Sequence, residues 1–121
     1  MRYLLDANAV IALLNDTTSR TAQRARREQP GDVAVSAFRS RRKTQNLALI
    51  DALQFLVLEF DKEDARQAGE VRAVLASKGT PIGPYDALIA GQAVARDMIL
   101  VTHNTQEFGR VPRLRLEDWQ E

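Results

Sequence analysis

The sequence predicts an α/β fold in three layers, in which helices cover both faces of a mainly parallel sheet. Short apolar runs alternate with segments of helical periodicity along the chain, and this order is typical of parallel strands joined by crossover helices. The 121 residues are 45% hydrophobic and 27% charged, which is ordinary for one globular domain. We therefore expect a single domain over residues 1–121.

Five short apolar runs are the expected strands. Each is short and contains the aliphatic residues that are typical of a buried strand. They are RYLLD at 2–6, VAVSA at 33–37, FLVLEF at 55–60, MILVT at 98–102 and a short edge strand in RLRLED at 113–118.

The segments between these runs have helical spacing. Asn8 is the expected N-cap of the first helix, Asp61 begins a long amphipathic helix and Gly79 ends it. The expected helices lie in 8–16, 17–29, 44–54, 62–78 and 85–97. The long helix should bury Ala65, Ala68, Val71, Val74 and Leu75, and small residues of the last helix should allow close packing, namely Ala87, Ala90, Gly91 and Ala93.

The charge and the composition limit the classes of protein to which this chain can belong. The net charge of +1 argues against a generally basic nucleic-acid coat, and the chain has no cysteine for a disulfide or thiolate metal site. No apolar run reaches membrane-spanning length, and an acid interrupts the opening residues where a signal peptide is apolar. We expect a cytoplasmic protein.

Basic residues gather in the first third of the chain. A solvated helix face explains these charges more simply than RNA contact does. Phosphate contact is the alternative. The residues are Arg20, Arg24, Arg26, Arg27, Arg39, Arg41, Arg42 and Lys43.

Acidic and amide side chains follow the expected strands or begin a helix. Asp6 closes the first strand, Asp86 lies in the first turn of the last helix, and Asn104 and Glu107 follow MILVT. Ligands of parallel α/β sheets bind at the carboxyl ends of the strands, and oxygen donors suit Mg²⁺ or Mn²⁺. Such an ion activates water and stabilises charge in phosphoryl transfer.

Each of these residues also has a structural explanation. Asp6 could be a helix cap, Asp86 a favourable charge at a helix N-terminus, and Glu107 a surface residue. Because these residues are expected together at one sheet edge, we favour a functional site over these separate structural roles. A histidine in a loop is more often a polar surface residue than a general acid or base, and we expect the same of His103. We expect Trp119 and Tyr85 to pack within the protein rather than to stack on RNA bases.

Three blocks of the sequence resemble a known family. YLLDANAVIALL, PIGPYDALIAG and VTHNTQEF, with the helices between them, look like a PIN-domain ribonuclease, specifically a VapC-type toxin of a bacterial toxin–antitoxin pair. The resemblance implies a three-layer α/β/α fold and metal-dependent cleavage of RNA, often transfer RNA. It also implies a VapB-type antitoxin partner, a homodimer and hetero-oligomers of toxin with antitoxin.

The resemblance also implies roles for individual residues. Asp6, Asp86 and Glu107 would be catalytic acids that bind Mg²⁺ or Mn²⁺. Asn104 would be a further metal ligand, where many relatives have an aspartate, and Asn8 would support Asp6 by hydrogen bonds. The residues that would contact RNA are Arg39, Arg41, Arg42 and Lys43.

One feature of the family is missing from this sequence. After the second strand, the family has a helix with a metal-binding glutamate, in a motif of the type Glu-Leu-x-x-Gly. Here the basic run follows Phe38 directly, and no acid occurs between Asp32 and Asp51. We expect about one three-turn helix to be missing near Ala37–Arg39, with ribonuclease activity weakened or lost. An inactive antitoxin-binding module and a poorly folding chain are the alternatives.

Overall fold

The computed structural model describes residues 2–16, 18–29, 31–36 and 55–120. Its centre is a five-stranded sheet in the order β3-β2-β1-β4-β5, and every neighbouring pair is parallel. The strands are β1 Tyr3–Leu5, β2 Val33–Ser36, β3 Leu56–Leu58, β4 Ile99–Val101 and β5 Arg115–Glu117. The predicted strands and their parallel arrangement are confirmed, including the short edge strand.

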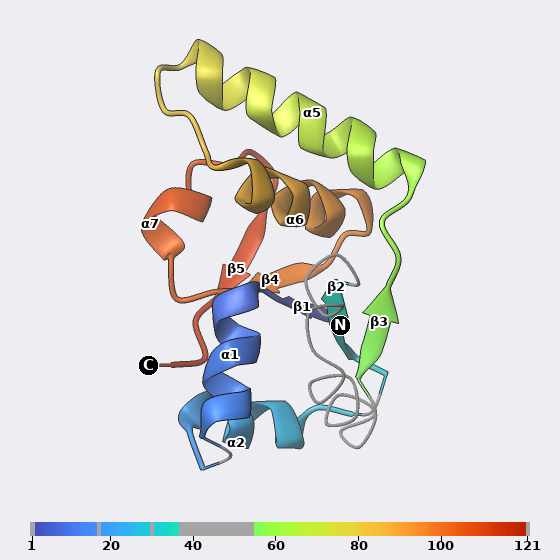
Figure 1. Ribbon diagram of the computed structural model, residues 1–121, viewed down its shortest axis with the longest axis vertical. Coiled ribbons are helices and arrows are strands. Elements are labelled where there is room, and N and C mark those ends of the chain that lie inside the picture. Colours follow the sequence, from blue (N-terminus) through green and yellow to red (C-terminus); the bar gives the residue numbers. More distant parts are fainter. Residues whose placement is uncertain (1, 17, 30, 37–54, 121) are drawn as a thin grey trace.

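Helices cover both faces of this sheet, which confirms the three layers (Figure 1). The described helices are α1 Ala7–Asn15, α2 Arg20–Arg27, α5 Lys62–Ser77, α6 Pro84–Ala95 and α7 Thr105–Phe108. The single turn α7 is absent from the sequence prediction, because four residues are too few to show a helical period.

Two hydrophobic cores lie on opposite faces of the sheet. Alternate residues of each strand point to opposite faces, so Tyr3 and Leu5 pack with α1 and α2, while Leu4 packs with α5 and α6. Trp119 joins the first core at 5% exposure, as predicted, whereas the prediction that Tyr85 packs is wrong because its exposure is 54%.

The long helix α5 has the predicted ends but a different buried stripe. Asp61 and Asp64 form a reciprocal capping box, and Gly79 follows the helix at φ +74°, a left-handed value that favours glycine. Ala65 is exposed, and Asp64 takes the buried position instead. Since Ala68, Val71 and Leu75 are also buried, the stripe begins one residue earlier than predicted.

The predicted close approach between helices is confirmed at Gly91 of α6. A Cβ atom on Gly91 would lie 2.4 Å from the backbone nitrogen of Ala68 in α5. The two backbones therefore touch at a position where any side chain would overlap. This contact fixes how α5 packs on α6.

A buried ion pair strengthens the same helix pair. Asp64 is 1% exposed, and its carboxylate accepts hydrogen bonds from Arg96 at 3.0 and 3.2 Å and from Gln92 at 3.2 Å. Arg96 also donates to the Glu59 carbonyl at 2.8 Å. The charge of Asp64 is thereby neutralised where water cannot reach it.

Replacing Arg96 by Met should destabilise the fold by about 2–3 kcal/mol, because the buried Asp64 charge would lose its partner. The free energy of unfolding in urea measures the effect. The matched control is Arg66→Met, which breaks an exposed pair with Glu63 and should cost less than about 1 kcal/mol. Equal effects of the two substitutions would contradict the role assigned to the buried pair.

Several predicted features lie outside the described residues. They are the helix within 44–54, the proposed gap near Ala37–Arg39 and the basic residues Arg39, Arg41, Arg42 and Lys43. Among the described residues, no helix is both long enough and apolar enough to cross a membrane.

Candidate active site

Asp6 lies at the junction between β1 and α1. Its carboxylate accepts a hydrogen bond from the backbone amide of Ala9 at 2.7 Å, so Asp6 is the N-cap of α1. The prediction that Asn8 is the cap is wrong, because the helix already begins at Ala7 and Asn8 lies within its first turn. The local chain thus holds the Asp6 carboxylate in one orientation at the end of the central strand.

The Asp6 carboxyl group is buried, with a residue exposure of 5%. Burial raises its pKa above the ordinary value, and the nearby negative charge of Asp118 raises it further. A hydrogen bond from Thr102 and backbone hydrogen bonds from Ala9 and Asn8 act in the opposite direction. The Asn8 side chain is exposed, so the support that Asn8 gives to Asp6 comes from its backbone.

Three strands end at one level beside Asp6. Leu5 pairs with Val101, and Val101 pairs with Glu117. The residues that follow these three positions are Asp6, Thr102 and Asp118. Their side chains therefore meet where β1, β4 and β5 end, at the carboxyl edge where parallel sheets bind ligands.

Hydrogen bonds continue from Asp6 to the residues after β4. Thr102 is 1% exposed, and its hydroxyl bonds to Asp6 and accepts the backbone amide of Asn104 at 3.0 Å. The Asn104 side-chain amide donates to the Glu107 carboxylate at 3.1 Å. The structure thus connects three of the predicted site residues, Asp6, Asn104 and Glu107, through Thr102.

Asp118 and His103 border the same edge. The His103 Nδ1 atom lies 2.9 Å from an Asp118 carboxylate oxygen, and the two side chains are 60% and 12% exposed. The sequence analysis missed Asp118 and Thr102. Both follow a strand directly, as Asp6 does, and that position was the available signal.

Asp86 belongs to α6 on the other side of the sheet. It lies in the first turn of α6 and is half-buried. The helix α6 leads into the parallel strand β4, so it runs in the direction opposite to the strands. Its N-terminus therefore lies at the carboxyl edge of the sheet. Asp86 therefore shares that edge with Asp6.

The donor groups at this edge have the chemistry of ligands for a metal ion. Carboxylate and amide oxygens match a hard divalent cation, and the sequence has no thiolate. Across residues 2–16, 18–29, 31–36 and 55–120, however, no three acidic or histidine side chains lie together closely enough to hold a metal ion. The donor chemistry fits, but the described residues do not complete a ligand set by themselves.

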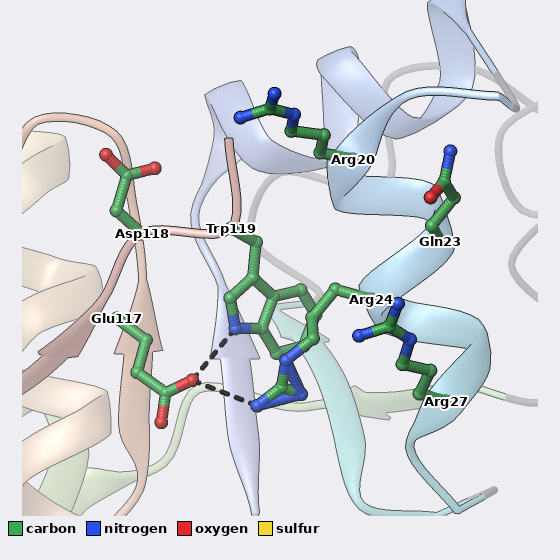
Figure 2. Close-up of a pocket in the computed structure, with 7 residues that line it drawn as sticks. All are labelled: Arg20, Gln23, Arg24, Arg27, Glu117, Asp118 and Trp119. Carbon is green, nitrogen blue, oxygen red and sulfur yellow. Dashed lines mark hydrogen bonds and ion pairs between the residues drawn. The ribbon is translucent and has the colours of Figure 1, made fainter. Parts of the chain in front are cut away.

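A pocket of about 460 Å³ lies next to this edge (Figure 2). One wall is a face of α2, and the other is the last residue of β5 with the segment that follows it. Its lining residues are Arg20, Gln23, Arg24, Arg27, Glu117, Asp118 and Trp119. Asp118 borders the pocket and also acts on Asp6, so the two features adjoin.

A profile of the PIN domain matches residues 3–114. The chain belongs to the PIN-domain family. The parallel sheet with an acid at the end of its central strand is thus the PIN-domain arrangement, and the resemblance inferred from the sequence is confirmed.

Relatives place this PIN-domain chain in the VapC group. It is 42% identical over 90 residues to the tRNA(fMet)-specific endonuclease VapC of Salmonella typhimurium, covering 73% of this chain and 68% of that protein. It is 36% identical over 131 residues to the protein of the same name from Shigella flexneri, covering 98% of each. The crystal structure of DNA-bound VapBC from Salmonella typhimurium matches with a TM-score of 0.83 at 32% identity, again covering 98% of each chain.

Replacing Thr102 by Val should lower cleavage of RNA by this PIN-domain chain by about ten- to a hundredfold, because a single lost hydrogen bond to a charged group is worth about 1.5–3 kcal/mol. Val keeps the volume of Thr102 but removes the hydroxyl that orients Asp6 and holds the Asn104 amide. Single-turnover cleavage rates test this. Replacement of the exposed Thr18 by Val is the control, and equal rates for wild type and Thr102→Val would contradict the role of Thr102.

Proposed function

We propose that this chain is a metal-dependent endoribonuclease of the VapC type, the toxin of a toxin–antitoxin pair. The observation that carries the proposal is the convergence of Asp6, Thr102 and Asp118 at the carboxyl edge of the sheet, with Asn104 and Glu107 linked to Asp6 by hydrogen bonds. The names of the relatives support RNA as the substrate, and two of them support transfer RNA.

Four residues would contribute oxygen ligands to the metal ion in this proposal, and water molecules that the ion retains would complete its coordination. The four residues are Asp6, Asp86, Asn104 and Glu107, and the ion would be Mg²⁺ or Mn²⁺. When bound, such an ion activates a water molecule and stabilises the charge that develops on a phosphodiester. The chain contributes the orientation of Asp6, which the α1 cap and Thr102 fix before any substrate arrives.

The sequence lacks positions that a relative has, and this supports a reduced ribonuclease activity. The alignment with the Shigella flexneri relative runs over 131 residues although this chain has 121, so at least ten positions have no counterpart here. With no acid between Asp32 and Asp51, we propose that the missing positions include the second acidic ligand. Fewer carboxylates hold a cation more weakly, and removal of a central catalytic group costs orders of magnitude in rate.

The shortened sequence also supports a second candidate function. A chain without the full set of acids could still bind an antitoxin while cleaving no RNA. Solved VapBC complexes from three bacteria share the fold of this chain at 29–32% identity. We propose a VapB-type antitoxin as partner, a homodimer as the toxin form, and a cytoplasmic location for the pair.

Cleavage of transfer RNA by the purified chain should require a divalent cation. EDTA should stop the reaction, and Mg²⁺ or Mn²⁺ in excess should restore it, because the acids of the site supply no metal-independent nucleophile. Gel analysis of end-labelled transfer RNA measures the products.

Three results separate the candidates. Metal-dependent cleavage supports the nuclease. Co-purification with an antitoxin but no cleavage at any metal concentration supports the inactive binding module. A broad melt at low temperature with dye binding to apolar surface would instead identify a chain that folds poorly.

A further inference from the structure

The helix α2 presents three arginines on one face toward the pocket. Arg20, Arg24 and Arg27 are spaced at i, i+4 and i+7, so they project from the same side of the helix. Figure 2 shows their guanidinium groups extending from α2 on the side that faces Glu117, Asp118 and Trp119. The sequence alone allowed two explanations of these charges, a solvated face or a phosphate contact.

The middle arginine is fixed by the protein itself. Arg24 forms ion pairs with Glu28 and with Glu117, the latter at 3.4 Å. Its guanidinium also lies over the rings of Trp119 and Tyr3, at 5.1 and 5.7 Å from their centroids. Arg24 therefore holds α2 against the sheet and has little capacity left for a ligand.

The acids of the pocket are also engaged by neighbouring groups. Glu117 accepts hydrogen bonds from Arg24 and from the Trp119 indole, the latter at 3.0 Å, and Asp118 lies against His103. Arg20 and Arg27, in contrast, are exposed, and no hydrogen bond or ion pair joins either to another described residue. The two outer arginines are therefore the groups available to an anion.

The pocket adjoins the candidate active site through Asp118, which lines the pocket and whose charge acts on Asp6. A polyanionic strand whose scissile phosphate lies at Asp6 must continue over neighbouring surface. Guanidinium groups bind phosphate oxygens with two parallel hydrogen bonds and keep their charge at all physiological pH values. A helix rise of 1.5 Å per residue separates the Arg20 and Arg27 backbones by about 10.5 Å along α2, which suits contacts to separate phosphates of one strand.

We propose that the pocket between α2 and residues 117–119 binds the phosphate backbone of RNA beside the catalytic edge, with Arg20 and Arg27 as its contacts. The inference rests on the proposed ribonuclease function and assigns residues that hold the substrate strand. Arg24 is a positioning residue in this site, since it orients α2 and the pocket wall.

Binding of a labelled single-stranded RNA oligonucleotide to the full chain tests the proposal. Fluorescence anisotropy in EDTA separates binding from cleavage, and titrations between about 50 and 200 mM salt give the salt slope. The variant is Arg20→Ala with Arg27→Ala. The control is Arg72→Ala with Lys78→Ala, which removes the same charge from an exposed position of α5 and from its exposed C-cap, on the opposite face of the sheet.

The double variant should bind the oligonucleotide roughly 25-fold more weakly at 0.1 M salt, since each lost contact to a single strand removes about 0.7 from the salt slope, or about fivefold in affinity. The salt slope should fall by about 1.4. The α5 control should change neither value beyond a small general effect. Circular dichroism melts show whether each variant is folded.

Several results would overturn the inference. They are no RNA binding by the wild type, equal binding by the folded double variant and the wild type, and an equal loss in the α5 control. Loss of antitoxin binding with RNA binding intact would also overturn it, because the pocket would then belong to the protein partner. Weaker RNA binding by the double variant in a chain that cleaves nothing would support this site while rejecting the proposed nuclease.

Discussion

Replacing Asp6 by Asn is expected to reduce metal-dependent RNA cleavage by at least about 10³-fold, to the background of the assay. Asp6 is the most buried of the candidate acids, and it is the one on which hydrogen bonds from α1 and Thr102 converge. Asn keeps the size and the oxygen that caps α1 but removes the negative charge. Single-turnover rates in Mg²⁺ and in Mn²⁺ measure the loss.

The same substitution should not weaken the fold. Since burial raises the pKa of Asp6, the folded state binds a proton more tightly than the unfolded state. The contribution of Asp6 to folding stability is fully present below about pH 3.9, the pKa of an aspartate in the unfolded chain. It is lost as the pH rises through the higher pKa that Asp6 has in the folded protein. At neutral pH the Asp6 charge therefore opposes folding, and Asp6→Asn in EDTA should melt at or above the wild-type temperature.

Two results would contradict this account of Asp6. Cleavage by Asp6→Asn at the wild-type rate would assign the chemistry to other acids. A melting temperature well below that of the wild type at neutral pH would show that the charge, rather than the cap, is what the fold requires. Asp16→Asn is the control, because Asp16 is an exposed acid at the other end of α1.

Replacing Gly91 by Ala should destabilise the fold by about 2–3 kcal/mol, which lowers the melting temperature by roughly 10 °C for a domain of this size. The added Cβ would lie 2.4 to 2.7 Å from three atoms of Ala68, two of them backbone. Neither helix can yield locally, so α5 and α6 must separate. The higher helix propensity of Ala offsets only about 1 kcal/mol of this cost.

Gly69→Ala is the matched control for this substitution. Gly69 lies in the interior of α5, next to Ala68, and a Cβ there meets nothing within 4 Å. The same change of residue should stabilise the protein by about 0.5–1 kcal/mol through helix propensity. Urea unfolding measures the change in the free energy of unfolding for both substitutions. Changes of opposite sign would demonstrate that packing against Ala68 decides the effect of Gly91→Ala. Stabilisation by Gly91→Ala would contradict the close contact.

Much of the fold could be predicted because its signals are local. The apolar runs gave the five described strands, and Asp61 and Gly79 marked the ends of α5. The errors are local as well. The predicted cap Asn8 lies two residues after the observed cap Asp6, and the predicted buried stripe of α5 wrongly includes Ala65. Both errors arise because neighbouring positions on a helix differ little in sequence pattern, and only the packing partner selects the buried face.

The candidate site could be predicted only in part. Asp6, Asn104 and Glu107 were found because carboxylates and amides after strands are a known signal, and the structure connects them. Asp86 was placed at the same edge by topology alone. Asp118 was missed because its role depends on β5 lying beside β4, and sequence spacing does not determine the order of strands in a sheet.

By itself, the sequence determined the alternation of strands and helices, the resemblance to PIN domains and the absence of an acid between Asp32 and Asp51, since these depend on residue types and on neighbours along the chain. Only the tertiary structure decided which groups surround Asp6. Register aligns the ends of β1, β4 and β5, so Thr102 and Asp118 reach Asp6 from distant parts of the chain. Burial at that junction then raises the pKa of Asp6, because desolvation depends on every segment that covers the carboxylate.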